Sequence, residues 1–143
     1  MFTRMDHVAV CVSNMERSIA FYHDLLGFEQ VFDRVFTAGM ASILGICEAD
    51  VRVVHMMLGD GVIELFEYRT PAGAPREAAP QWAHGITHIG LRVEGFWAAY
   101  EALCAHGLHF MGEPTEIRPN VWVSYFYGPD GEVLEMRELP KAE

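Results

Sequence analysis

Two histidines and two glutamates stand in matching sequence contexts, and their side chains are suited to binding a metal ion. His7 begins the run HVAVCV and His88 begins HIGLRV, whereas Glu64 and Glu135 each follow an Asp-Gly pair within an apolar segment. Unrelated surface residues have no reason to recur in this way, so the pattern predicts a duplicated module. Two imidazoles and two carboxylates suit one borderline divalent ion such as Zn, Ni, Co, Mn or Fe. The sequence therefore predicts that these four residues bind a single ion.

Strand alternation predicts that the four side chains share one side of a sheet. Successive side chains of a strand point to opposite faces. The apolar residues that follow His7 and His88 at odd spacing form the face that packs on helices, so the histidines point to the other, concave face. Ala9 and Gly90 beside them leave room for a ligand. The residues predicted to line a substrate pocket are Cys11, His55, Phe66, Tyr68, Arg92 and Trp122.

The repeat extends beyond the ligands and defines two modules within one domain, residues 1–143. Each module, 5–68 and 86–138, has the pattern of a strand, a helix and about three strands. The segment 69–85 is rich in proline and glycine and is predicted to be a linker. It is either a plain connector or a flap over the pocket, in which Trp82 forms an apolar wall.

Local signals position the helices and turns. Ser13 and Glu16 form a capping box before the first helix, and Gly27 ends it. Gly107 ends the second helix, whose start has no clear signal. An Asp-Gly pair before each glutamate-bearing strand predicts a hairpin turn. The apolar face of the first helix comprises Met15, Ile19, Tyr22 and Leu26, and that of the second Phe96, Ala99 and Leu103.

Composition excludes several classes of partner. The formal net charge is −10, which argues against nucleic acid or an anionic membrane. No apolar run approaches the roughly 20 residues that span a bilayer, and we expect no signal peptide. The three cysteines are odd in number and form no CxxC pair. These features predict a cytoplasmic protein with reduced thiols.

These motifs resemble the vicinal oxygen chelate superfamily, which includes glyoxalase I, methylmalonyl-CoA epimerase and extradiol dioxygenases. The similarity covers nearly the whole chain, through DHVAV, RSIAFY with LLGF, IEL, THIGL, and GPDG leading into LE. The resemblance implies an α+β fold in which two tandem βαβββ modules form a U-shaped mixed sheet around a metal. It also implies a homodimer and a small-molecule substrate with a carbonyl or vicinal oxygens.

The ligand pattern most resembles the four-ligand, glyoxalase I-like members. Ring-cleaving dioxygenases use only a triad, which matches His7, His88 and Glu135. Epimerases usually carry glutamine where this chain has Glu64. Glyoxalase I tends to have arginine and asparagine, used for glutathione, where this chain has Cys11 and Tyr68. Both departures argue against glutathione.

The resemblance and the carboxylates together predict a metal-dependent lyase or isomerase. The metal would polarise a carbonyl, Glu135 would remove the adjacent proton, and Glu64 would return a proton on the other face or carbon. The alternatives are an Fe(II) extradiol-type dioxygenase, an epimerase of an acyl-CoA thioester, and a protein that binds a hydrophobic small molecule without catalysis.

Overall fold

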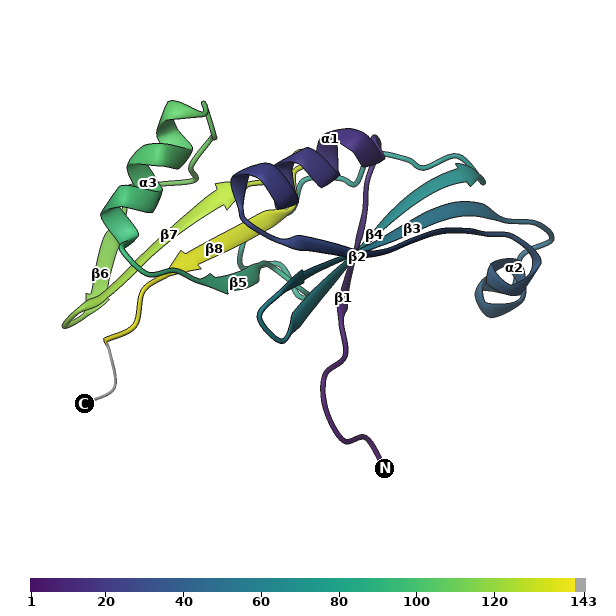
Figure 1. Ribbon diagram of the computed structural model, residues 1–143, viewed down its shortest axis with the longest axis horizontal. Helices are drawn as coiled ribbons and strands as arrows, with labels where there is room; N and C mark the ends of the chain where they lie inside the picture. Colours follow the sequence, from purple (N-terminus) through teal and green to yellow (C-terminus); the bar gives the residue numbers. More distant parts are fainter. Residues whose placement is uncertain (141–143) are drawn as a thin grey trace. The chain divides into compact units, whose positions relative to one another are not determined.

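The computed structural model describes residues 1–140, and the chain divides into two compact units (Figure 1). The first unit is Met1–Arg76 and the second is Glu77–Glu143. The division falls within the segment 69–85, in which residues 71–80 are all exposed. Trp82 is 85% exposed.

The first unit is a four-stranded sheet with the order β1-β4-β3-β2. β1 pairs with β4 in parallel, and the other neighbours are antiparallel. A helix and a π-helical turn connect β1 to β2, and a short helix, α2, lies at the far ends of β2 and β3 (Figure 1). In chain order the elements are β1 (Val8–Cys11), α1 (Met15–Ala20), η1 (Phe21–Leu25), β2 (Glu29–Phe36), α2 (Ala38–Leu44), β3 (Asp50–Leu58) and β4 (Gly61–Thr70).

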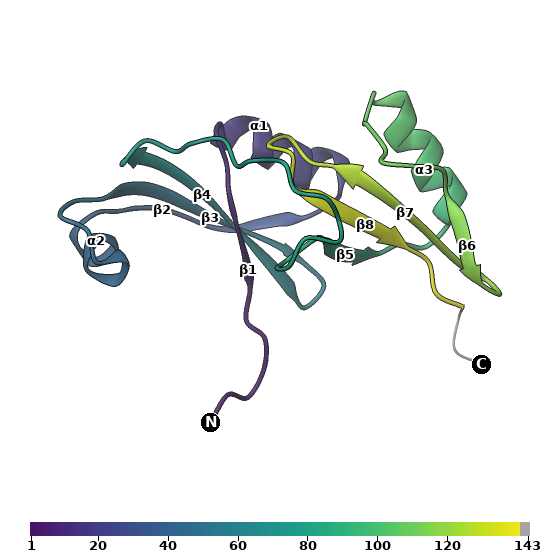
Figure 2. The same cartoon turned by 180° about the vertical axis from the view of Figure 1, so that it is seen from behind.

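The second unit repeats this topology with the order β5-β8-β7-β6. β5 is parallel to β8, and the remaining pairs are antiparallel. Figure 2 shows α3 beside the sheet that β6, β7 and β8 form. The elements are β5 (Ile89–Arg92), α3 (Phe96–Ala105), β6 (Thr115–Arg118), β7 (Val121–Tyr127) and β8 (Val133–Arg137). The prediction of two βαβββ modules is therefore confirmed.

Each unit buries apolar side chains between its helix and one face of its sheet. In the first unit the ring of Tyr22 is fully buried and packs edge-on against Phe28, with centroids 5.5 Å apart. In the second, Phe96 of α3 is fully buried, as is Leu134 of β8. Burying one such side chain stabilises a fold by roughly 1.5–3 kcal/mol. The opposite face of each sheet is thus left for the polar residues of the predicted site.

The first helix begins one residue later than the predicted capping box requires. Asn14 is the N-cap, and its side-chain oxygen accepts a hydrogen bond from the backbone N–H of Arg17 at 2.9 Å. The capping box of Ser13 and Glu16 was therefore wrong. Asparagine caps as well as serine, and the carboxylate of Glu16 instead pairs with Arg52 of β3. Gly27 ends the helical segment with φ +78°, as predicted.

Three residues after each of the two predicted glutamate ligands, a second glutamate caps the helix of its own unit. Glu67 of β4 accepts a hydrogen bond from the backbone N–H of Met15 at 2.8 Å. Glu138 accepts from the N–H groups of Gly95 and Phe96 at 2.9 and 3.1 Å. These carboxylates satisfy N–H groups that a helix start leaves without intrahelical partners. The residue that caps the start of α3, Glu138, lies 42 residues after Phe96 in the sequence. For this reason the residues next to the helix start contain no capping signal.

Two local features differ from the sequence-based expectations. The helix α2 was not predicted, and no side chain caps its start. The first hairpin turn consists of Gly59 and Asp60 rather than Asp60 and Gly61, because Leu58 pairs with Gly61 and Gly59 has φ +58°. A positive φ favours glycine, so the register places the turn one residue earlier.

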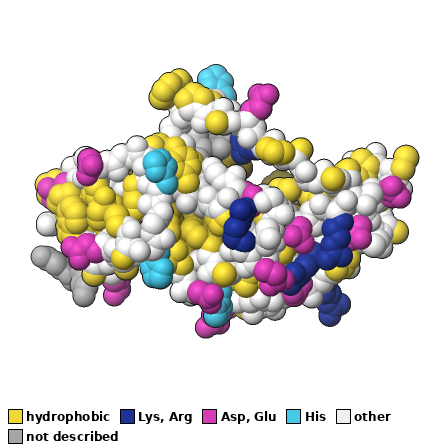
Figure 3. Space-filling model, turned by 90° about the horizontal axis from the view of Figure 1, so that it is seen from above, with side chains coloured by type: hydrophobic (Ala, Val, Ile, Leu, Met, Phe, Trp, Pro, Cys, Tyr) yellow, Lys and Arg dark blue, Asp and Glu magenta, His cyan; other side chains and the backbone are white. Residues whose placement is uncertain are grey.

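Acidic side chains outnumber basic ones on the face drawn in Figure 3, in keeping with the net charge of −10. Within residues 1–140, no helix has the length and apolar character needed to cross a membrane.

Candidate functional site

In the first unit, His7 and Glu64 lie side by side. His7 immediately precedes β1, and Ala9 of that strand is the parallel neighbour of Glu64 on β4. Nε2 of His7 lies 3.2 Å from Oε2 of Glu64. The side chain of Glu64 is only 13% exposed, whereas that of His7 is 39% exposed. The carboxylate is therefore shielded and the imidazole borders the solvent.

The second unit builds the same pair from His88 and Glu135. Nε2 of His88 lies 3.1 Å from Oε2 of Glu135, whose side chain is 12% exposed. Gly90 is the parallel neighbour of Glu135, and a methyl group at Gly90 would lie 3.4 Å from Oε2. Gly90 therefore faces the carboxylate. The small residue leaves space there, as the sequence predicted.

The other ring nitrogen of each histidine contacts the residue that precedes it. Nδ1 of His7 lies 3.0 Å from Oδ2 of Asp6, and Nδ1 of His88 lies 3.0 Å from Oγ1 of Thr87. The hydrogen bond with His7 lowers the pKa of Asp6. Such contacts orient an imidazole and leave Nε2 for a ligand. Sequence analysis did not identify these two residues, although their position before each histidine was the available signal.

The donor set and its spacing fit a divalent metal ion. Ligand atoms about 2.1 Å from one ion lie roughly 3.0–3.4 Å from each other when they are neighbours in its coordination shell. The two His–Glu distances, 3.2 and 3.1 Å, match that spacing. Within residues 1–140, no group of three or more His, Cys, Asp and Glu side chains is arranged to hold a metal. Within each unit, one His–Glu pair thus has the spacing of neighbouring metal ligands.

The two glutamates differ in their neighbours on the adjacent strand. His55 of β3 pairs with Glu64, and its Nε2 lies 2.9 Å from Oε1 of that carboxylate. The ring of Phe32 stacks on His55 with centroids 4.3 Å apart. Glu64 is thus held through both oxygens by two imidazoles. His55 was predicted only to line the pocket, and the structure adds its contact with Glu64.

In the second unit Tyr125 occupies the position that corresponds to His55. It is the direct neighbour of Glu135 on the adjacent strand, and its ring lies 4.9 Å from that of His88, centroid to centroid. Burial, and secondarily the negative charge of Glu135, raise the pKa of Tyr125. Its phenol is therefore neutral at ordinary pH. Alternation places Tyr125 and Trp122 on opposite faces of β7, but only the register with β8 shows which of them faces Glu135, and sequence analysis chose Trp122.

A cleft of about 720 Å³ opens beside Glu64 in the first unit. Its polar wall includes His55 as well as Glu64. The residues that line it are Arg4, Met5, Asp6, His55, Met57, Gly59, Asp60, Val62 and Glu64. A volume of this size accommodates a small organic molecule.

The other pocket residues predicted in the first unit lie on the same face as Glu64. Cys11 is the parallel neighbour of Phe66, and the rings of Phe66 and Tyr68 stack with centroids 6.1 Å apart. Burial raises the pKa of Tyr68, and the nearby thiol of Cys11 adds to the effect. This end of the face is therefore apolar and aromatic.

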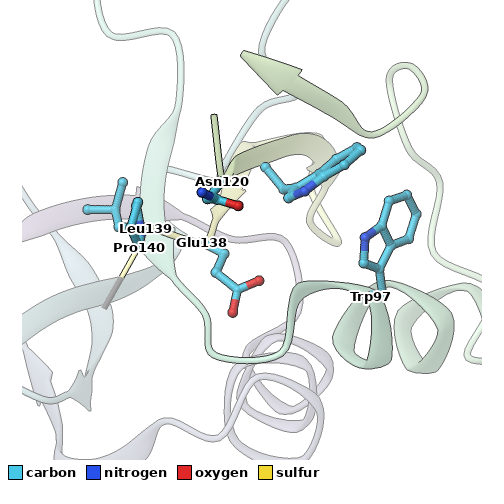
Figure 4. A pocket seen from close by; sticks show the side chains of 6 residues that line it. Trp97, Asn120, Glu138, Leu139 and Pro140 are labelled. Atoms are coloured by element: carbon cyan, nitrogen blue, oxygen red, sulfur yellow. The ribbon is translucent and has the colours of Figure 1, made fainter. Parts of the chain in front are cut away.

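Trp122 does not lie on the face that carries Glu135, so that pocket prediction was wrong. Its ring packs on α3, 4.8 Å from the ring of Trp97, and alternation along β7 places it opposite Tyr125. It borders a separate cleft of about 420 Å³, with Asn120 and Glu138 (Figure 4). Arg92 does lie on the Glu135 face, because it is paired with Arg137 two residues beyond Glu135.

Comparison with known proteins agrees with this architecture. Residues 4–136 match the Glyoxalase/Bleomycin resistance protein/Dioxygenase superfamily. A 2-epi-5-epi-valiolone epimerase from Actinomyces sp. is 31% identical over 94% of this chain and 78% of its own.

Solved structures share the fold. A glyoxalase family protein from Bacillus cereus has a TM-score of 0.88 at 22% identity, over 96% of this chain and 95% of its own. A fosfomycin resistance protein from Listeria monocytogenes, determined with Mn(II) and sulfate, has a TM-score of 0.65 at 13% identity, over 99% and 96% of the two chains. The matched residues include both His–Glu pairs. This protein belongs to the glyoxalase/bleomycin resistance protein/dioxygenase superfamily.

Proposed function

We propose that this protein is a metal-dependent isomerase that moves a proton at a carbon next to a carbonyl group. One divalent ion would be bound by His7, Glu64, His88 and Glu135. The observation that carries the proposal is the repetition of a His–Glu pair, at 3.2 and 3.1 Å, on corresponding strands of the two units. Zn, Ni, Co, Mn and Fe all suit this donor set.

A bound divalent ion supplies Lewis-acid polarisation of a carbonyl oxygen, which acidifies the neighbouring C–H. The imidazoles of His7 and His88 present Nε2, because Asp6 and Thr87 contact their other nitrogens. Both carboxylates are nearly buried, and such shielding from water strengthens their electrostatic interactions with ligands. The protein residues thus supply the ligands, their orientation and the bases.

The neighbours of the two glutamates assign them different roles. Glu64 is contacted by two imidazoles, at Oε1 and at Oε2. Glu135 is contacted by one imidazole, at Oε2, and within residues 1–140 no hydrogen bond engages its other oxygen. The unengaged oxygen of Glu135 can approach a substrate C–H, whereas both oxygens of Glu64 are engaged. Glu135 therefore removes the proton, and Glu64 is the group that returns a proton on the other face.

Epimerisation is the isomerase reaction that the comparisons support best. The curated relative at 31% identity is named as an epimerase. Cys11 and Tyr68 occupy the positions at which a glutathione-binding enzyme of this type would use arginine and asparagine. The apolar and thiol character of that wall, with Phe66 beside both, suits a substrate other than a glutathione adduct.

Solvent deuterium exchange tests the proposal directly. The metal-loaded protein is incubated in D₂O with a panel of hydroxy ketones, acyl-CoA thioesters and 2-oxo thiohemiacetals, and deuterium at the carbon next to the carbonyl is measured by mass spectrometry. We expect exchange with at least one class, and a loss of roughly 10²–10⁴-fold in Glu135→Gln. Glu101→Gln, an exposed residue of α3, is the matched control.

Three outcomes would redirect the proposal. Exchange that survives in Glu135→Gln assigns the base elsewhere. Oxygen uptake on catechols by iron-loaded protein, without exchange, supports the dioxygenase alternative with Glu64 off the metal. Saturable binding of a panel compound with neither exchange nor oxygen uptake supports a binding protein. A homodimer, which the superfamily resemblance implies, is tested by sedimentation of the same preparation.

A further inference from the structure

We infer that Arg92 and Arg137 form an anion-binding subsite that holds a carboxylate or phosphate group of the substrate. The two residues are direct neighbours on the parallel strands β5 and β8. Arg92 lies two residues after Gly90, and Arg137 lies two residues after Glu135, which is the neighbour of Gly90. Alternation therefore places both side chains on the face that carries Glu135. The inference rests on the proposed function for the identity of the reacting group.

Neither guanidinium group is paired with a carboxylate of the described residues. Within residues 1–140, neither arginine side chain forms a salt bridge or a hydrogen bond, and Nε of Arg137 is buried without a partner. Arg137 is half-buried. Val123 of β7 is the direct neighbour of Arg137, and Tyr125 lies two residues further along that strand on the same face.

Two adjacent cations with an unsatisfied buried donor are unfavourable unless an anion binds between them. Like charges at direct neighbours on a sheet destabilise the pair, and a buried donor without a partner is also destabilising. An anion relieves both costs. The planar guanidinium fork matches the oxygens of carboxylate and phosphate.

The first unit has no such arrangement at the corresponding positions. Cys11 occupies the position of Arg92, four residues after the histidine, and Phe66 that of Arg137, two residues after the glutamate. Those two residues are also direct neighbours on their strands. One module therefore offers a cationic surface and the other an apolar one. The paired arginines are therefore a feature of the second unit alone.

The spacing indicates the size of the substrate. Two residues along a strand span roughly 6.6 Å, so the anionic group lies about that far from Glu135. A carboxylated or phosphorylated compound of monosaccharide size spans this distance. We therefore assign the substrate class as a small ketone or hydroxy ketone that carries a carboxylate or a phosphate.

Anion binding can be measured without the metal or turnover. The side-chain Nε signals of the arginines are followed by NMR in the full-length, metal-free chain during titration with inorganic phosphate, with acetate, and with chloride at matched ionic strength. We expect the Arg92 and Arg137 signals to move saturably with phosphate or acetate and not with chloride. If phosphate binds more tightly than acetate, the substrate carries a phosphate group, and if acetate binds more tightly, it carries a carboxylate.

Four variants locate the site. Arg92→Gln and Arg137→Gln should each weaken the anion at least fivefold, and Arg137→Lys, which keeps the charge without the fork, should also weaken it. Arg17→Gln on α1 removes the same charge far along the sequence and should bind as the wild type does. Thermal unfolding checks that each variant is folded.

The result that would overturn the inference is the absence of saturable shifts, or equal shifts with chloride, or equal weakening in Arg17→Gln. Failure of the proposed function gives a different pattern. A chain that binds no divalent metal but still binds phosphate or acetate at the two arginines refutes the metal-dependent reaction and retains the subsite. A chain that exchanges deuterium but binds no anion refutes the subsite and retains the metal-dependent reaction.

Discussion

The imidazole of His55 holds the carboxylate of Glu64, with Nε2 2.9 Å from Oε1. This contact is absent from the second unit, where Tyr125 takes the corresponding place beside Glu135. The duplicated module therefore keeps its His–Glu pair and changes the residue behind it. The difference distinguishes the roles of two otherwise similar carboxylates.

His55 should raise the affinity of the chain for a divalent ion by orienting Glu64. Removing a residue that hydrogen-bonds to a metal ligand typically lowers the metal affinity by about 10–100-fold. We expect His55→Leu to weaken Mn²⁺ or Zn²⁺ binding in that range, measured by calorimetric titration. His55→Gln retains a donor and should lose less. Tyr125→Phe keeps the ring against His88 and is the matched control. Equal affinity in His55→Leu and the wild type would contradict the assignment.

The two helix-capping glutamates should stabilise their own units without serving in catalysis. Loss of a cap typically costs about 0.5–2 kcal/mol. Glu67→Ala and Glu138→Ala should each lower the free energy of unfolding by about 1 kcal/mol in urea denaturation, because Met15, and Gly95 with Phe96, lose their acceptors. Glu101→Ala is the control on α3. A cap variant as stable as the control would show that solvent replaces the carboxylate.

The ion pair between Asp33 and Arg52 should make the first unit sensitive to acid. Two hydrogen bonds, at 3.0 and 2.7 Å, join the guanidinium to the carboxylate and lower the pKa of Asp33. A lowered pKa in the folded state contributes stability that is present above the ordinary pKa near 3.8 and is lost as pH falls through the folded value.

The measurement is urea unfolding of Asp33→Asn and the wild type at several pH values. The variant should be less stable at pH 7, and the difference should shrink below about pH 4. Asp60→Asn, at the hairpin turn, should show no such convergence with pH. A difference between Asp33→Asn and the wild type that is constant down to pH 2 would rule out the ionised pair as its cause.

Sequence patterns predicted the fold and the pairing of ligands within each unit, because both depend on local alternation and on a visible repeat. The strand face of His7, Ala9 and Cys11 follows from a period of two, and the structure has it. The same rule, applied from Glu135 across to β7, would have selected Tyr125 rather than Trp122. That step requires the register between strands, which a single sequence does not state.

Other features depend on contacts between distant residues. The start of α3 is fixed by Glu138, and the second carboxylate oxygen of Glu64 by His55. The short helix α2 has neither a side-chain cap nor a strong apolar period, so no local signal announced it. The pairing of Arg92 with Arg137 emerged only from the register of β5 and β8.

The central claim is that both His–Glu pairs serve one ion, and metal stoichiometry tests it most directly. The protein is loaded with Mn²⁺ or Zn²⁺, desalted and analysed for metal per chain, together with His7→Ala and His88→Ala, which remove one ligand from each unit. We predict one ion per chain in the wild type and loss of tight binding in both variants. Two ions per chain, or unchanged binding in either variant, would contradict a shared four-ligand site.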